Sequence, residues 1–374
     1  MKLLHTSDWH LGRVLHEQSL LEDQHYILTR ILDILKNEPH DGLLVAGDVY
    51  DRTLPSADAV SLLSWFLSSL KEFSDIPVII IPGNHDSSRR LSYCSDILAA
   101  SNLHIWGSIE DVGQPLILSA GDEKAAFFPI PFLDQGSFYI EEKPVRDHEA
   151  AMIEAMSRID VRDTGDLPRI CIAHCFVSNG SVSDSERSVV GGSASVSPDL
   201  FQPFDYAALG HLHRPQEAGE RAAYSGSILK YSFSEYNDVK EVRSVEIEKG
   251  SLKVNPIPLL PRRDMVRLKG SFSSLLDSDK FSSYREDYIE AELTDSLLIS
   301  NAMATLRKRF PWILSVKQQP PTVEERGEGE IDISDTKRSL EDDFNVFHQY
   351  LYGEEAAAEK KKLFLNLGKE GEKE

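Results

Sequence analysis

Five short polar clusters along this chain carry the side chains that bind metal ions and transfer protons. In chain order they are Asp8-x-His10, Gly47-Asp48, Gly83-Asn84-His85-Asp86, His174 and Gly210-His211-x-His213. One such cluster is a weak signal, because a lone histidine after a strand is more often a hydrogen-bonded structural residue. Five clusters of nitrogen and oxygen donors hold enough groups for two metals that share one carboxylate. Mixed imidazole and carboxylate ligands suit manganese, iron or zinc, and the lack of cysteine ligands argues against a structural zinc site.

The third cluster ends an apolar stretch, residues 77–81, whose β-branched side chains predict a strand buried on both faces. Pro82 and Gly83 stop this strand. Taken alone, the turn at 84–86 has two equally good interpretations: a site for a metal or phosphate ester, and a plain loop with an Asx-turn. The four other clusters favour the site.

Strands and helices in the first part of the chain bring the first three clusters together. Strands are expected at 2–7, 42–46 and 77–81. Apolar residues at helical spacing predict one helix between 20 and 35, closed by Pro39, and another at 56–73. This alternation predicts an α/β fold with a parallel sheet and helices on its faces. Since such sheets carry ligands at the carboxyl ends of their strands, the clusters should meet there.

Later segments predict a second sheet and a long loop. Two expected strands, 169–173 and 206–209, deliver His174 and His211. Between Phe176 and Pro198 runs a Ser/Gly-rich segment without apolar periodicity, and a loop this long is more often functional than idle. Further strands are expected at 103–106 and 125–130, a helix at 145–157, and antiparallel strands that complete a second sheet at 222–225, 241–248 and 252–257.

Composition sets the class of protein. The 374 residues are 41% hydrophobic and 27% charged, with no apolar run long enough to span a bilayer. The first residues lead straight into a strand rather than a signal peptide, so we expect a cytoplasmic protein. Three cysteines without metal-binding spacing imply no disulfide framework. The formal charge of −21 argues against DNA binding by an overall basic field, so any DNA role needs local basic patches, bound cations or a partner.

The sequence predicts four regions: a main domain at 1–260, a small α+β capping domain at 261–322, an acidic linker at 323–338 and a helical segment at 339–374. The last region carries an apolar stripe of Leu340, Phe344, Phe347 and Leu351. Little of its own domain remains for this stripe to pack on, which favours a partner's groove. Packing back onto this chain is the alternative.

The clusters together resemble the signature of the calcineurin-like metallophosphoesterases. Within that superfamily, five motifs are similar to the SbcD family of double-strand-break-repair nucleases: residues 6–12, 47–51, 183–187, 208–213 and 224–227. The match is strong over about residues 1–260 and weaker over the cap and tail. The resemblance implies a four-layer fold, in which two sheets form a sandwich flanked by helices, with a small capping domain and a C-terminal helical tail.

The resemblance also implies the roles of individual residues. One metal would be held by Asp8, His10 and His213, the other by Asn84, His174 and His211, and Asp48 would bridge them. His85 would stabilise or protonate the leaving oxygen, the alternative being a structural residue behind the ligands. Asp86 would orient His85 or a neighbouring ligand. Many relatives carry a histidine thought to contact phosphate where this chain has Asp51, so no phosphate-binding role is transferred there.

The implied function is a nuclease with two divalent metals, manganese first and iron or zinc as alternatives. It would act as an exonuclease on double-stranded DNA ends and as an endonuclease on hairpins and single strands, in DNA repair, recombination and replication. It would form a homodimer and, with an SbcC-type coiled-coil ATPase, a heterotetramer. One alternative is a phosphatase or small-molecule phosphodiesterase, which needs neither cap, long loop nor stripe. The other alternative is a non-catalytic scaffold of the same fold. Such scaffolds typically lose metal-binding residues, whereas every expected metal-binding residue is present in this sequence.

Overall fold

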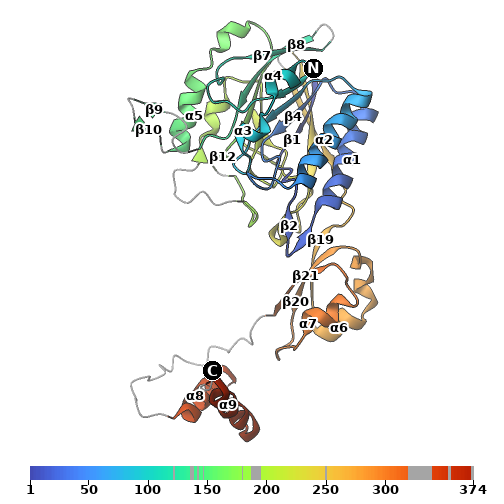
Figure 1. Cartoon of the computed structure of the whole chain (residues 1–374), viewed down its shortest axis with the longest axis vertical. Coiled ribbons are helices and arrows are strands. Elements are labelled where there is room, and N and C mark those ends of the chain that lie inside the picture. The colour runs from blue at the N-terminus through green and yellow to red at the C-terminus, as the bar shows by residue number, and fades with distance from the viewer. Residues whose placement is uncertain are drawn as a thin grey trace. The chain divides into compact units, whose positions relative to one another are not determined.

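The structure is a computed structural model of the whole chain (Figure 1). It describes residues 1–120, 123–134, 139–140, 143–145, 147–178, 180–186, 195–248, 251–318, 339–352 and 355–371. The chain divides into two compact units: Met1–Arg267 with Glu286–Glu290, and Leu268–Arg285 with Ala291–Glu374. The expected acidic linker at 323–338 lies outside the described residues.

The first sheet of the larger unit has the strand order β18-β17-β1-β4-β5-β6. Its parallel strands are β1 (Lys2–Thr6), β4 (Gly42–Ala46), β5 (Val78–Ile81) and β6 (Leu103–Ile105). Strands β4 and β5 are buried throughout, as their uninterrupted apolar sequences predict. Helix α1 (Leu21–Asn37) connects β1 to β4, and helix α2 (Ala57–Phe73) connects β4 to β5. The side chain of Ser56 caps α2 by accepting a hydrogen bond from the Ala59 N–H at 3.2 Å.

Strands β17 (Glu241–Glu248) and β18 (Ser251–Pro258) extend this first sheet, and the expectation that they complete the second sheet is wrong. Strand β17 pairs antiparallel with β1, placing Leu3 opposite Val245. The alternation of Val245 and Ile247 with polar residues predicts a strand with a buried face, but alternation does not say which edge of a sheet the strand joins. The partner is far away in sequence, at the N-terminal strand.

The second sheet has the order β15-β16-β14-β11-β8-β7. Its central strands β8, β11, β14 and β16 are parallel, and the register places His174, the last residue of β11, opposite Gly210, the last residue of β14. The strands are β7 (Leu116–Ala120), β8 (Glu123–Ile130), β11 (Arg169–His174), β14 (Tyr206–Gly210), β15 (Gln216–Glu217) and β16 (Ala222–Tyr224). Both sheets therefore deliver polar clusters from strand ends.

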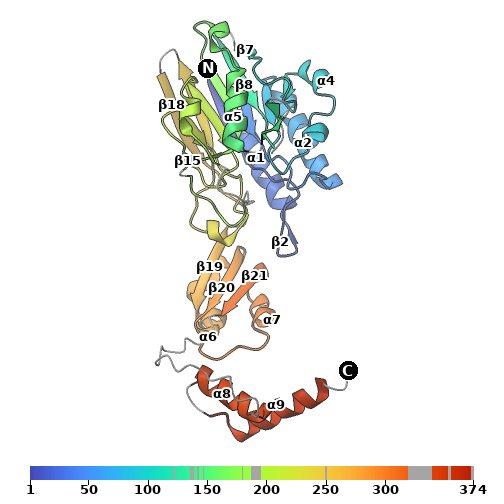
Figure 2. The same ribbon diagram turned by 90° about the vertical axis from the view of Figure 1, so that its left-hand side faces the viewer.

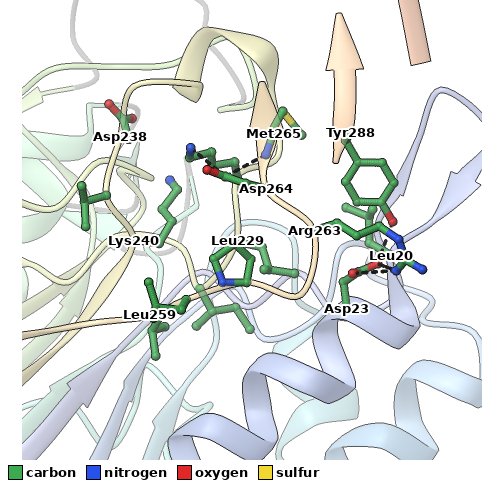
Figure 3. A pocket seen from close by; sticks show the side chains of 15 residues that line it. Leu20, Asp23, Leu229, Asp238, Lys240, Leu259, Arg263, Asp264, Met265 and Tyr288 are labelled. Atoms are coloured by element: carbon green, nitrogen blue, oxygen red, sulfur yellow. Dashed lines mark hydrogen bonds and ion pairs between the residues drawn. The ribbon is translucent and has the colours of Figure 1, made fainter. Parts of the chain in front are cut away.

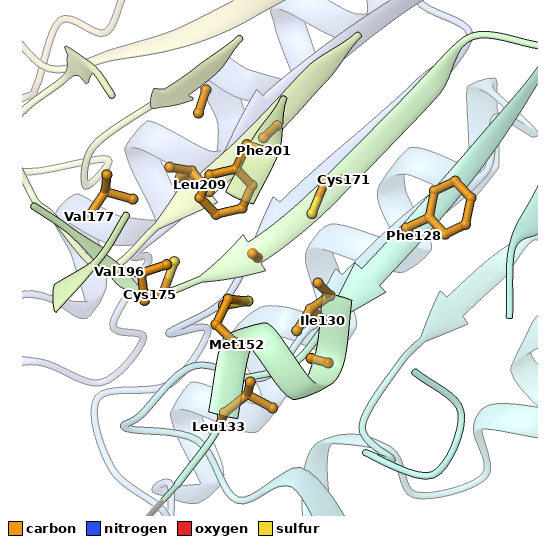
Figure 4. Packing of buried hydrophobic residues seen from close by; sticks show 14 of the residues in the cluster. Phe128, Ile130, Leu133, Met152, Cys171, Cys175, Val177, Val196, Phe201 and Leu209 are labelled. Atoms are coloured by element: carbon orange, nitrogen blue, oxygen red, sulfur yellow. The ribbon is translucent and has the colours of Figure 1, made fainter. Parts of the chain in front are cut away.

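The cores on either side of the second sheet show how the layers pack. Phe127 faces a core shared with the first sheet, together with Leu44 and Ile79, whereas its neighbour Phe128 faces the opposite core. The opposite core contains Met152 of α5 (His148–Ser157) and is drawn in Figure 4. Helices α1 and α2 lie on the other side of the sandwich from α5 (Figure 1), and in the turned view α5 faces the viewer (Figure 2). The order of layers is thus helices, sheet, sheet, helix, as expected from the resemblance.

The remaining elements are short or belong to the C-terminal part of the chain. A three-stranded sheet is formed by β19 (Met265–Gly270), β20 (Tyr288–Leu293) and β21 (Ile313–Gln318), with helices α6 (Phe272–Asp277) and α7 (Ala302–Arg307). The tail forms α8 (Leu340–Tyr352) and α9 (Ala358–Gly371). Short elements are β2 (Val14–Leu15), β3 (Gln18–Ser19), α3 (Ser88–Leu91), α4 (Ser95–Ala99), β9 (Tyr139–Ile140), β10 (Lys143–Pro144), β12 (Phe176–Val177) and β13 (Ser195–Val196). Among the described residues, no helix has the length and apolar character needed to cross a bilayer.

Candidate metal centre

The five polar clusters converge at the carboxyl ends of strands from both sheets. The Nε2 atoms of His10 and His213 lie 3.1 Å apart. Beside them, Asn84 Oδ1 lies 3.0 Å from Nε2 of His174 and 2.9 Å from Nδ1 of His211. Two sets of donors thus form, one after β1 and β14 and the other after β5, β11 and β14. The structure thus brings together the residues of both sets that the resemblance implies, and their roles as metal ligands stay a prediction.

Asp48 lies between the two sets. Its Oδ2 atom is 3.5 Å from Nε2 of His10 and 3.6 Å from Nε2 of His174. Its other oxygen, Oδ1, accepts a hydrogen bond from the His85 N–H at 2.8 Å. One oxygen is therefore held by the backbone while the other faces one imidazole from each set. A carboxylate placed in this way can be shared by two cations, one at each donor set.

Burial sets the charge of the donors. Desolvation, followed by the neighbouring His213, lowers the pKa of His211 to about 3. Burial also lowers the pKa values of His10 and His174 well below the ordinary value. These imidazoles are therefore neutral and offer lone pairs. Burial raises the pKa of Asp8 to about 7, although His213 acts in the opposite direction, so this carboxylate lacks compensating positive charge in the metal-free chain.

The donor chemistry fits divalent cations. Three groups of buried residues have ligand atoms within 4.8 Å of one another: Asp8, His10 and His213; Asp8, Asp48 and His174; and His10, Asp51 and His85. Neutral imidazoles and carboxylates at this spacing are typical ligands of manganese, iron and zinc. A cation would also compensate the buried negative charge of Asp8 and Asp48.

The backbone around these donors is unusual. Asp8, His10, Asp48 and His211 all have positive φ, at 52°, 46°, 49° and 109°. Such conformations are costly for residues other than glycine and gather at functional sites, where surrounding contacts hold them. Here the carbonyls of Gly47 and Asp48 accept the backbone N–H groups of Asp8 and His10, at 3.0 and 2.9 Å. The loops after β1 and β4 thus hold each other in place.

Two glycines permit the close approach of the loops. A Cβ atom on Gly83 would lie 2.2 Å from Oδ1 of Asp48. One on Gly210 would lie 1.8 Å from the carbonyl oxygen of Ala46. Any side chain at these positions would push apart the strand ends that carry the donors. This explains why glycine precedes Asn84 and His211 in the sequence.

His85 is buried at the edge of the donor set. Its Nδ1 lies 2.8 Å from the carbonyl oxygen of Asp51, which can only accept, so this nitrogen carries the proton. Its ring stands edge-on to that of His10, with centroids 4.7 Å apart. The remaining nitrogen, Nε2, is therefore the atom that can exchange a proton with a reacting group. Its catalytic role stays a prediction.

Asp86 holds the backbone of two donor loops together. Its carboxylate accepts hydrogen bonds from the N–H groups of Val49 at 3.0 Å, Tyr50 at 2.9 Å and Gly83 at 2.9 Å. Burial raises the pKa of Asp86 to about 6 in spite of these three bonds. Of the two roles expected for Asp86, orientation of a neighbouring ligand fits these contacts better than orientation of the His85 ring.

The carboxylate of Asp51 forms an ion pair with the side chain of Arg13. Its Oδ1 accepts a hydrogen bond from Nη1 of Arg13 at 2.7 Å and lies 3.7 Å from Nδ1 of His10. The guanidinium of Arg13 stands over the ring of Tyr231, 5.9 Å from its centroid. Asp51 therefore places a basic group beside the donor set. Sequence reasoning assigned no role to Arg13.

Sequence reasoning also missed Gln24, which clamps the loop after β1. Its Nε2 donates to the carbonyl of His10 at 2.7 Å, and its Oε1 accepts from the N–H of Gly12 at 2.9 Å. Its neighbour Asp23 accepts hydrogen bonds from Arg263 at 3.0 Å and from the Tyr288 hydroxyl at 2.6 Å (Figure 3). Gln24 looks like an ordinary polar residue of an amphipathic helix, so no local pattern reveals its contact with the loop.

A further missed group lies behind His213: Ser185, Glu186, Glu235 and Lys240. The Nδ1 of His213 lies 2.7 Å from the Ser185 hydroxyl, and its backbone N–H donates to Glu186 at 2.6 Å. Glu235 pairs with Lys240 at 2.6 Å. Ser185 and Glu186 belong to the motif at 183–187 that carries the resemblance, so that motif was the available signal. Nothing in the sequence pointed to Glu235 or Lys240.

The apolar stripe of the tail lies on α8. Phe344 stacks on Phe364 of α9, with ring centroids 4.2 Å apart, whereas the side chain of Phe347 is 57% exposed. The side chains of Leu340 and Leu351 lie outside those that the structure describes. Packing within the tail thus uses Phe344 and leaves Phe347 accessible. A partner for this stripe stays a prediction.

Comparison with known proteins assigns the family. The calcineurin-like phosphoesterase family matches residues 1–215, and the family described as type 5 capsule protein repressor C-terminal domain matches residues 261–354. A protein of Staphylococcus saprophyticus, named as the D subunit of the nuclease SbcCD, is 33% identical over 323 residues, which are 85% of this chain and 85% of that protein. A protein of the same name from Staphylococcus epidermidis is 35% identical over 321 residues, 84% of this chain and 85% of that protein.

Among solved structures, the TT1561 protein of Thermus thermophilus is similar at 12% identity, with a TM-score of 0.42 and coverage of 68% of this chain and 98% of that one. The sequence relatives are much closer and span most of both proteins. The chain therefore belongs to the calcineurin-like phosphoesterase family and, within it, to the family of SbcCD nuclease D subunits.

Proposed function

We propose that this chain is a metal-dependent DNA nuclease, the D subunit of an SbcCD-type complex, which hydrolyses phosphodiester bonds at the site around Asp48. The observation that carries the proposal is the position of Asp48 Oδ2, 3.5 Å from His10 and 3.6 Å from His174. Two relatives that are named as D subunits of the nuclease SbcCD support it, since they match about 85% of this chain.

The proposed ligands divide as the donor sets do. Asp8, His10 and His213 would hold one cation, and Asn84, His174 and His211 the other, with Asp48 shared. When bound, two divalent cations neutralise the charge that builds up on a phosphodiester and activate water for attack. Manganese is the proposed metal, and iron and zinc fit the same donors.

The residues of the chain would supply position and proton transfer. His85, whose Nδ1–H donates to the Asp51 carbonyl, would act as the imidazolium: carrying a second proton on Nε2, it would pass that proton to the leaving oxygen and return to the neutral Nδ1–H form. Because burial lowers the pKa values of His10 and His174, their imidazoles are neutral, and no second proton competes with a metal ion for their lone pairs. Arg13 places its guanidinium beside the donor set, and Asp51, 2.7 Å away, balances that charge in a chain whose formal charge is −21. The metals and a partner would supply the rest of the attraction for DNA.

We further propose exonuclease action on double-stranded ends and endonuclease action on hairpins and single strands, in repair, recombination and replication in the cytoplasm. The proposed domains are the nuclease domain at 1–260, the cap at 261–322, the acidic linker and the partner-binding tail. The partner is a coiled-coil ATPase of the SbcC type that takes the stripe on α8. The exposed ring of Phe347 supports this, because an exposed aromatic side chain on an amphipathic helix is a typical anchor in a groove.

A homodimer, giving a heterotetramer with the ATPase, completes the proposal. An apolar groove of about 530 Å³ runs between α2 and the α3–α4 segment, lined by Leu63, Leu67 and Tyr93 among others. Tyr93 and Ile97 are 76% and 73% exposed. Large exposed apolar side chains on adjacent helices suit a self-complementary interface. The oligomeric state of an Ile97→Glu variant tests it: a monomer is expected, and an unchanged dimer excludes this face.

The experiment that tests the function compares substrates. The purified chain with manganese should nick a hairpin oligonucleotide and degrade linear double-stranded DNA, and both activities should disappear with a chelator. A generic phosphomonoester is the matched substrate for the phosphatase alternative. Hydrolysis of the phosphomonoester without any DNA cleavage, alone or with the ATPase, would reject the nuclease.

A further inference from the structure

A buried ion pair lies behind the proposed metal ligand His213. The ammonium of Lys240 and the carboxylate of Glu235 are 2.6 Å apart, and their side chains are 3% and 0% exposed. Burying two opposite charges stabilises a fold little, because the desolvation cost roughly offsets their attraction. A pair of this kind is better explained by what it holds in place.

Glu235 connects to His213 through one hydroxyl. The Oγ atom of Ser185 lies 2.5 Å from Oε1 of Glu235 and 2.7 Å from Nδ1 of His213. A serine hydroxyl has one proton to donate, and a carboxylate can only accept. The Ser185 proton therefore goes to Glu235, and the Ser185 oxygen accepts a hydrogen bond from His213. This direction of bonds requires the His213 proton to be on Nδ1.

The same network also holds the backbone of His213. Lys240 Nζ donates to the His213 carbonyl at 2.7 Å and to the Ser227 hydroxyl at 2.9 Å. Lys240 also lines a pocket of about 150 Å³ that is partly walled by Leu229 and Leu259 (Figure 3). These apolar neighbours limit the access of water to the ion pair, which strengthens the attraction between the two charges. Glu235 is thus fixed as an acceptor.

We propose that Ser185 and Glu235, backed by Lys240, are positioning residues that fix His213 as the Nδ1–H tautomer and aim the lone pair of Nε2 into the metal centre. In this tautomer Nε2 of His213 carries a lone pair and can bind a metal. That atom lies 3.1 Å from Nε2 of His10, inside the proposed metal centre. The inference rests on the proposed function only in that it takes His213 as a metal ligand. It gives the long loop at 176–198 a role, because Ser185 lies on it.

Two measurements on the full chain test this proposal, and neither uses nuclease activity. The first is nitrogen NMR of the histidine side chains in metal-free protein, which reports which ring nitrogen carries the proton. The wild type should show His213 protonated on Nδ1, and Ser185→Ala should move protons toward Nε2. The second is calorimetric titration with Mn²⁺, in which Ser185→Ala should weaken one of two sites by about 10- to 100-fold and leave the other unchanged.

Three variants separate positioning from packing. Ser185→Thr keeps the hydroxyl and should restore both the tautomer and the affinity. The double variant Glu235→Leu with Lys240→Met removes the acceptor of the Ser185 proton and the ammonium together, so that no buried charge is left unpaired, and it should reproduce the effect of Ser185→Ala. Ser181→Ala removes an exposed serine from the same loop and should behave as wild type.

The outcomes separate failure of the positioning role of Ser185 and Glu235 from failure of the proposed nuclease function. An unchanged tautomer in Ser185→Ala, or equal loss in Ser185→Ala and Ser185→Thr, overturns the positioning role even if the chain cleaves DNA. The expected shifts in tautomer and affinity support it even if no DNA is cleaved, and in that case only the proposed function fails.

Discussion

The Nε2 atoms of His10 and His213 face each other at 3.1 Å in the buried interior of the larger unit. Two imidazole nitrogens in this orientation can share one proton or bind one cation between them. Ligand atoms of Asp8, His10 and His213 lie within 4.8 Å of one another, and Asp48 Oδ2 lies 3.5 Å from Nε2 of His10, so two carboxylates stand beside the pair of imidazoles. A divalent cation therefore suits this position better than a single proton does.

His85→Ala should leave metal binding intact and lower the rate of DNA cleavage by about 100- to 10,000-fold, the usual range for loss of a general acid. The reason is that the backbone N–H of His85, not its ring, holds Asp48. Metal content and single-turnover cleavage rates are the measurements. His25→Ala, at an exposed position of α1, is the control and should keep full activity. A His85→Ala protein that cleaves at the wild-type rate would exclude the catalytic role.

Gly83→Ala should lower the manganese content from two ions per chain to less than one. Its Cβ would lie 2.2 Å from Oδ1 of Asp48 and displace the shared carboxylate. Elemental analysis after gel filtration measures this. Gly270→Ala is the matched control, because the nearest atom to its Cβ lies at an ordinary 3.6 Å. Two bound ions in Gly83→Ala would show that the close approach of these loops does not matter for binding.

Phe347→Ala should weaken binding of the ATPase by 10-fold or more without changing thermal stability, because its side chain is 57% exposed. Truncation before Glu341 should abolish the complex. Ile153→Ala removes a comparably exposed side chain, at 51%, from α5 and should bind normally. Titration calorimetry against the purified ATPase gives the affinities. Undiminished binding by the truncated chain would reject the tail as the docking segment.

The stability of the metal-free chain should fall below neutral pH because of His5. Its Nδ1 lies 2.9 Å from the Tyr206 hydroxyl and its Nε2 lies 3.2 Å from the Leu209 carbonyl. Burial, helped by Arg243, lowers the pKa of His5 from 6.5 to about 3. Between these values the unfolded chain binds a proton that the folded chain does not. The free energy of unfolding should therefore drop by about 1.4 kcal/mol for each pH unit below 6.5.

Urea unfolding at pH 7.5 and pH 5 measures the contribution of His5 to the free energy of unfolding. The comparison is with His5→Gln, whose side chain at position 5 has no group that titrates. The wild type should lose about 2 kcal/mol more than the variant over this interval. Equal losses in both proteins would show that His5 does not control the acid limb.

Much of the fold could be predicted from the sequence because its signals are local. The apolar runs of β4 and β5 and the helical spacing of α1 are written in consecutive residues. The pairing of β17 with β1 was missed, because it depends on a partner more than two hundred residues away in the chain. The glycines before Asn84 and His211 lie where one loop closely approaches another, at Asp48 and at the Ala46 carbonyl, and these approaches become visible only when the strand ends are packed together.

The same distinction applies to the site. The donors were found because they follow strands, and the structure brings them together, although their roles as ligands stay predictions. Gln24 and Glu235 were missed, because a helical glutamine and an isolated glutamate leave no pattern that tells of a contact with a distant loop. Long-range hydrogen bonds of this kind depend on the completed fold.

Manganese stoichiometry, measured together with DNA cleavage for the wild type and Asp48→Asn, tests the shared role of Asp48. We expect two manganese ions per wild-type chain and cleavage of a hairpin oligonucleotide. Asp48→Asn should bind manganese more weakly and cleave at least 100-fold more slowly, because the carboxylate that lies between the two donor sets is lost. Two tightly bound ions and undiminished cleavage in Asp48→Asn would contradict a metal centre built on Asp48.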